Sequence, residues 1–160
     1  MIKIDKKYDI EKIRNEIALM LATHELVKGS QLMLQSPNGD DWYDNRAPYQ
    51  IHPDLRETDF KKSNTPDDWE ITRFINENGL CRTRLLKLKS RECYTWHKDV
   101  GHRIHLAVIT NDKCFFVEHG QLQNIPSDGH PYMVDVGDYH TAMNCSDYDF
   151  DRIHLVGVIR

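Results

Sequence analysis

The sequence predicts a mainly β protein with flanking helices, a double-stranded β-helix of the jelly-roll, cupin-like kind. Two observations predict this fold class. From Leu80 onward, short apolar segments recur at intervals of about 8–12 residues, separated by turn sequences, as in sandwiches and barrels. Ahead of them, two segments carry helical periodicity and would cover one face of a sheet.

Size and composition indicate a single domain of ordinary soluble character. The chain has 160 residues, of which 39% are hydrophobic and 29% charged, and a formal charge of −4 that argues against nucleic acid or an anionic membrane as partner. No segment reads as a signal peptide or a membrane span. We expect residues 1–160 to form one catalytic unit, with 1–79 as helical and loop support and 80–160 as the jelly-roll core.

The four cysteines are widely spread and form no CxxC motif. This spacing fits a reduced, cytoplasmic protein better than a disulfide framework. It also disfavours a zinc site built on cysteines, which needs short paired spacing.

The first helix is predicted from Asp9 to Leu21. Ile10, Ile13 and Ile17 fall on one helical face, and Asp9 stands where the helix dipole favours an acid. The second helix is predicted within Ser63–Gly79. Thr65 would be its N-cap, Pro66 its first residue and Gly79 its left-handed stop.

Alternating or apolar segments predict the strands, which are expected at Gln31–Gln35, Leu86–Lys89, Ile104–Thr110, Cys114–Glu118, Leu122–Ile125, Tyr132–Val136, His140–Asn144 and Ile153–Ile159. Residues 36–50 are dense in turn chemistry and contain Trp42, Tyr43 and Tyr49. They form either a substrate-facing lid or a loop anchored on the core by its aromatic side chains.

A metal site is indicated by His97 and Asp99. In a strand, residues i and i+2 point to one face, so this pair can aim an imidazole and a carboxylate at one point. His140, at the start of a later strand, completes a two-histidine, one-carboxylate triad, which leaves positions open on Fe(II). His102 would point away in a regular strand. The alternative is that the HxD pair binds no metal, since the chain has nine histidines and such a pair can occur by chance. His24, His52, His119 and His130 are expected in loops or on the surface.

The tetrapeptide Arg-Ile-His-Leu occurs twice, beginning at Arg103 and at Arg152. An arginine in the apolar strand after Arg152 needs a partner, because an unpaired buried charge is costly. The partner is either the carboxylate of a co-substrate or an acid of the chain such as Asp149 or Asp151. Arg103 and His105 would share one strand face, where both can bind the same acid. Alternatively, Arg103 is a residue of the cavity rim and His105 is a hydrogen-bonded histidine of the core.

Leu80–Ile159 resembles the catalytic domain of the aspartyl/asparaginyl β-hydroxylase family, which includes proline-hydroxylase-like enzymes. These are Fe(II)- and 2-oxoglutarate-dependent oxygenases with a double-stranded β-helix. The matching elements occur in the family's order: Arg82-Thr83-Arg84-Leu85, His97-Lys98-Asp99, Arg103-Ile104-His105, Thr110-Asn111, His140 with Asn144, and Arg152-Ile153-His154-Leu155.

The resemblance implies that His97, Asp99 and His140 bind iron and carry the catalysis. It implies that Arg152 pairs with the distal carboxylate of 2-oxoglutarate, assisted by Arg103 and His105. Where the hydroxylases that act on epidermal-growth-factor-like domains have a co-substrate serine, this chain has Leu86, and it lacks their helical repeats and membrane anchor.

The expected activity is hydroxylation of an amino acid, free or within a peptide or protein. Two other functions remain open: a cupin-like metal-binding protein without 2-oxoglutarate chemistry, and a non-catalytic jelly-roll module that binds a sugar or small acid. Zinc-dependent hydrolysis fits the donor set less well. The sequence leaves the substrate, small molecule or peptide, and the oligomeric state open.

Overall fold

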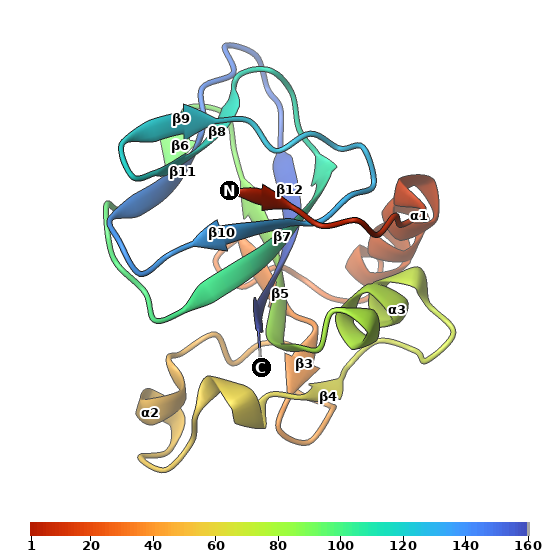
Figure 1. Ribbon diagram of the computed structural model, residues 1–160. Coiled ribbons are helices and arrows are strands. Elements are labelled where there is room, and N and C mark those ends of the chain that lie inside the picture. The colour runs from red at the N-terminus through yellow and green to blue at the C-terminus, as the bar shows by residue number, and fades with distance from the viewer. Residues whose placement is uncertain (160) are drawn as a thin grey trace.

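The structure, a computed structural model, describes residues 1–159 and is mainly β with few helices (Figure 1). The larger sheet has six strands in the order β1 (Ile2–Lys3), β10 (Tyr132–Asp135), β7 (His102–Ile109), β12 (Arg152–Ile159), β5 (Leu80–Leu88), β2 (Gln31–Met33). The smaller sheet has the order β6 (Glu92–Cys93), β11 (His140–Asn144), β8 (Cys114–Glu118), β9 (Gln121–Gln123). A separate ribbon pairs β3 (Gln35–Ser36) with β4 (Lys62–Ser63).

The connectivity from β5 onward is that of a jelly roll. Successive strands cross between the two sheets, except that β8 and β9 form a hairpin within the smaller one. The last strand, β12, returns between β5 and β7 in the larger sheet, and β11 returns between β6 and β8 in the smaller one. Two interleaved Greek keys of this kind define the jelly roll, and they confirm the predicted fold class. None of the helices within residues 1–159 has the length and apolarity needed to cross a membrane.

The larger sheet separates two kinds of side chain. On β7 and β12 the outward residues pack with the helices in one core, whereas alternate residues point between the sheets, as the period of a strand requires. The outward set is Ile104, Leu106, Val108, Ile153 and Leu155. The space between the sheets has its own small apolar core around Ala107, Phe116, Val134 and Ala142.

Helix α1 (Ile10–Leu21) forms where the sequence predicted it. The Asp9 side chain accepts a hydrogen bond from the Lys12 backbone N–H, which satisfies one free donor of the first turn. Ile13, Ile17 and Met20 are buried against the sheet. In Figure 1 the helix lies beside α3 (Glu70–Glu77), and together they cover the outward face of the sheet.

The predicted start of the second helix is wrong. Thr65 bonds to the Thr72 hydroxyl instead of capping, and α3 begins only at Glu70. The buried Glu16 carboxylate of α1 accepts the backbone N–H groups of Glu70 at 2.7 Å and Ile71 at 3.0 Å. A side chain distant in sequence thus caps the helix, which no local pattern can reveal. Gly79, with φ 59°, follows the helix end as expected.

Two strand predictions also need correction. The expected strand Gln31–Gln35 is divided between β2 and β3, which pair with different partners. Strand β5 begins at Leu80 instead of Leu86. Its first part is interrupted at Arg82, which takes a left-handed conformation (φ 49°) where the register against β12 shifts. Such a bulge breaks the two-residue alternation by which a strand is recognised. Residues 36–63 also contain a short helix, α2 (Pro48–Ile51), and a 3-10 turn, η1 (Glu57–Asp59).

Candidate metal centre

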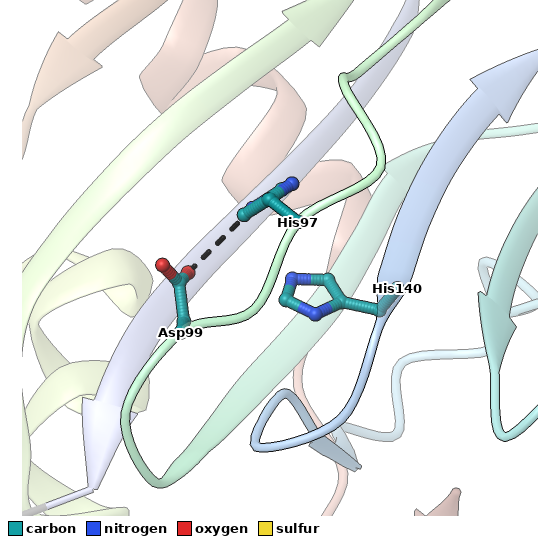
Figure 2. A group of neighbouring side chains, drawn as sticks. All are labelled: His97, Asp99 and His140. Atoms are coloured by element: carbon teal, nitrogen blue, oxygen red, sulfur yellow. Dashed lines mark ion pairs between the residues drawn. The ribbon is translucent and has the colours of Figure 1, made fainter.

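The structure brings His97, Asp99 and His140 together at the mouth of the barrel (Figure 2). The sequence analysis expected His97 and Asp99 in a strand. They lie instead in the extended loop between β6 and β7. Two backbone hydrogen bonds between His97 and His140, of 2.9 and 3.3 Å, fix the loop to the start of β11. The Asp99 N–H donates to the Val136 carbonyl at 2.8 Å. The loop is therefore held as firmly as a short strand would be.

The three side chains converge. One potential ligand atom from each lies within 4.8 Å of the other two, and His97 Nε2 is 3.8 Å from Asp99 Oδ2. That distance is too long for a hydrogen bond, so the two side chains do not bond to each other and their ligand atoms stay available to a metal. His140 is buried, whereas the side chains of His97 and Asp99 remain more than one-third exposed.

Hydrogen bonds to backbone carbonyls set the tautomer of both histidines. His97 Nδ1 lies 2.6 Å from the Thr95 carbonyl oxygen, and His140 Nδ1 lies 3.0 Å from that of Asp138. A carbonyl oxygen only accepts, so each Nδ1 carries the proton and each Nε2 presents a lone pair to the site. Histidines that bind metals are oriented in this way. Two histidines and one carboxylate therefore fit a divalent transition metal.

The triad opens into a cavity of about 390 Å³ between the two sheets. Its walls come from both sheets and from the segment before η1, which contributes Asn45 and Ala47. Trp42 of that segment instead stacks on His24, with ring centroids 4.3 Å apart. Trp42 therefore anchors this segment on the protein, as one interpretation expected, while Asn45 and Ala47 line the cavity; a lid function of residues 36–50 stays a prediction.

Arg103, one of the predicted co-substrate residues, is buried beside the triad. Its guanidinium donates to Glu57 Oε1 at 3.2 Å and to the Val100 carbonyl at 2.9 Å, and lies 3.6 Å from Asp99 Oδ2. Glu57 also accepts from Arg82 at 2.7 Å. The carboxylate of η1 thus holds two arginines at the triad end of the cavity.

Arg152, the other predicted arginine, is buried and lines the same cavity. Within residues 1–159 its guanidinium forms no ion pair; its hydrogen bond is to His154 Nδ1 at 3.0 Å. The alternative partner Asp151 pairs with Lys87 instead. Burial lowers the pKa of Arg152 to about 10, which reflects the cost of holding this charge without an acid.

His105 is buried between the sheets, with its ring edge against Phe116 at a centroid distance of 5.1 Å. Its Nδ1 is buried and has no hydrogen-bond partner in the described chain. Burial, with Arg152 and Arg103 nearby, holds the pKa of His105 well below its usual range, so the ring is neutral. It is therefore not the hydrogen-bonded core histidine that was the other interpretation. His102 is exposed and lies outside the triad.

Three residues in or beside the cavity were given no role by the sequence analysis: Arg82 and Arg84, which line it, and Glu57, which binds Arg82. Glu57 sits in a polar segment with no pattern that singles it out. The two arginines alternate within the apolar run of β5, and the reasoning applied to Arg152 would have marked them as well.

Comparisons with known proteins found structural likenesses at low sequence identity. No family model matches the chain, and no curated protein matches its sequence. Two similar solved structures are a cupin-2 domain protein from Shewanella frigidimarina (14% identity, TM-score 0.38, covering 49% of this chain and 70% of that one) and a protein from Thermotoga maritima described as a predicted oxalate decarboxylase (18% identity, TM-score 0.39, covering 54% and 74%). Likenesses this distant carry no argument about function, which we base on the site itself.

Proposed function

We propose that the protein is an Fe(II)- and 2-oxoglutarate-dependent oxygenase that hydroxylates an amino acid, either free or in a peptide. The donor set supports iron, because His97, Asp99 and His140 would hold the ion and leave positions for a chelating 2-oxoacid and for oxygen. The resemblance of Leu80–Ile159 to the β-hydroxylases points the same way.

Arg152 is the observation that supports 2-oxoglutarate as the co-substrate. A buried guanidinium without an acid is costly, and it opens onto the cavity that holds the triad. A carboxylate is the ligand whose geometry matches its two parallel N–H donors. In this proposal the distal carboxylate of 2-oxoglutarate binds Arg152, and the 2-oxoacid end reaches the metal.

The chain's own groups then bind, orient and exclude water. His97 and His140 present Nε2 because their Nδ1 protons are donated to carbonyls. Arg103 forms an ion pair with Asp99 across 3.6 Å, which would help to orient that carboxylate toward the metal. His105, neutral and with an unpaired nitrogen, can donate an N–H to a carboxylate of the bound acid. When bound, the iron and oxygen would supply the oxidation, in which the 2-oxoacid becomes succinate and carbon dioxide while a C–H bond becomes C–OH.

The test is an anaerobic visible titration of the metal-free protein with Fe(II) and then with 2-oxoglutarate. We expect the weak charge-transfer band of a chelated 2-oxoacid. Arg152→Met, which keeps the apolar volume but removes the carboxylate partner, should weaken 2-oxoglutarate binding by roughly tenfold or more. Arg91→Met, at an exposed arginine that bonds a surface-loop carbonyl, is the matched control and should bind normally.

The other functions give different results. A cupin-like metal protein without 2-oxoglutarate chemistry would bind Fe(II) at His97, Asp99 and His140 but show no band at saturating co-substrate. A non-catalytic module would bind neither tightly. Either result contradicts the proposal.

A further inference from the structure

Four arginines line the cavity, and their partners divide them into two classes. Arg82 and Arg103 share the carboxylate of Glu57. Arg84 and Arg152 line the same cavity but form no ion pair with any acid of residues 1–159. The proposed function uses Arg152 for the co-substrate, which leaves one guanidinium of the cavity without an assigned anion.

Arg84 lies at the other end of the cavity from Arg152. On β5 it stands opposite Val156 of β12, which itself pairs with His105 of β7, whereas Arg152 stands opposite Leu88. The charges that act most on Arg84 are those of Arg82, Arg103 and Glu57, all at the triad end. Arg84 therefore lies toward the triad end of the cavity, where a C–H bond would approach the metal, whereas the distal carboxylate of the co-substrate would lie at Arg152.

The environment of Arg84 is that of an anion receptor. Its Nε is buried and has no hydrogen-bond partner within the described chain. Burial, with Arg82 and Arg103 as like-charged neighbours, lowers its pKa to about 10. The four guanidiniums exceed the acids Asp99 and Glu57, which line and border the cavity, by two charges that the co-substrate dianion would balance, and Fe(II) at the triad would add two more positive charges. A partly buried guanidinium without an acid beside it is stabilised by an anionic ligand.

We propose that Arg84 binds a carboxylate of the primary substrate, so that this oxygenase acts on an acid and discriminates against the corresponding amide. The inference rests on the proposed function, since it assigns Arg84 to the substrate by reserving Arg152 for 2-oxoglutarate. The carboxylate is either an acidic side chain or the α-carboxylate of a free amino acid, and it forms two parallel hydrogen bonds with the guanidinium.

The experiment compares acids with their amides. L-aspartate and L-glutamate are paired with L-asparagine and L-glutamine, which test an acidic side chain, and L-proline is paired with L-prolinamide, which tests an α-carboxylate. Binding is measured by calorimetry on the full chain, first without metal and then anaerobically with Fe(II) and 2-oxoglutarate. We expect at least one acid to bind about tenfold or more tightly than its amide in the loaded protein.

Arg84→Met should reduce that preference to about twofold or less, and Arg84→Lys should restore part of it, because lysine keeps the charge but loses the fork of donors. The visible band with 2-oxoglutarate should be unchanged in Arg84→Met. Lys87→Met removes a cation from the same strand, where it pairs with Asp151 outside the cavity, and should leave the preference intact. This control excludes a general effect of net charge.

The inference is wrong if every amide binds as well as its acid, if no acid binds in an Arg84-dependent way, or if Arg84→Met abolishes the 2-oxoglutarate band, which would place Arg84 on the co-substrate. Failure of the proposed function looks different. The wild type would then lack the band altogether, while the Arg84-dependent preference for an acid could still be measured in the metal-free protein.

Discussion

The two copies of Arg-Ile-His-Leu are identical in sequence and lie on adjacent antiparallel strands, yet their arginines have opposite environments. In both copies the arginine and histidine point between the sheets, and the isoleucine and leucine pack toward the helices. Arg103 is held by two carboxylates and a carbonyl, whereas Arg152, among the partners that residues 1–159 offer, bonds only to the histidine of its own copy.

The difference arises from what the antiparallel arrangement places at each end of the strands. The start of β7 lies beside the triad loop and η1, which supply Asp99 and Glu57. The start of β12 lies at the opposite end of the strands, where Arg152 pairs with Leu88 of β5. The nearby acid Asp151 forms an ion pair with Lys87 instead. Local sequence therefore decides which face an arginine takes, and distant segments decide whether it is structural or free to bind a ligand.

The largest expected difference between the copies is in stability without ligands. Arg103→Met leaves Glu57 and Asp99 short of a partner and should lower the free energy of unfolding by about 2 kcal/mol. Arg152→Met removes an unpaired buried charge but also the partner of His154, and these effects should offset to within about 1 kcal/mol. Urea unfolding of the metal-free protein measures both.

The same measurement at saturating 2-oxoglutarate and Fe(II) serves as the control, since the ligand should stabilise the wild type more than Arg152→Met. Equal losses in the two variants without ligand would show that Arg152 has a structural partner after all.

The histidines of the two copies should behave alike. Burial holds the pKa of His105 and of His154 well below the usual value, so both stay neutral in the folded protein. The unfolded chain takes up protons below about pH 6.5, so stability should fall as the pH drops from there, with a slope that approaches about 1.4 kcal/mol per pH unit for each histidine. His105→Leu and His154→Leu should each remove that share of the slope in urea unfolding between pH 6.5 and 5.5. His52→Gln, at an exposed loop histidine, should leave the slope unchanged.

Much of the fold was predictable because its information is local. Two-residue alternation with intervening turns predicted the strands from β7 to β12, and Asp9 with its helical face predicted α1. The late start of α3 was not predictable, because Glu16 caps it from another helix. The bulge at Arg82 hid half of β5 for a different reason, since it breaks the alternation itself.

The candidate site divides in the same way. His97, Asp99 and His140 were found from an i, i+2 pair and a later strand start, even though the pair lies in a loop. Glu57 was missed, because its role comes only from the folding of residues 36–63 over the barrel mouth, which brings it to Arg82 and Arg103. An ion pair between segments this far apart has no signature in either segment.

The smallest expected effect concerns the acid next to Arg152 in sequence. Asp151→Asn removes a partly exposed ion pair with Lys87 and should change the free energy of unfolding by less than about 0.5 kcal/mol. The affinity for 2-oxoglutarate should not change, because Asp151 does not hold the guanidinium. Glu57→Gln is the matched change at the other copy and should cost more, since Arg82 and Arg103 both lose a partner. If Asp151→Asn instead altered 2-oxoglutarate binding several-fold, Asp151 would be orienting Arg152, and the second copy would be paired like the first.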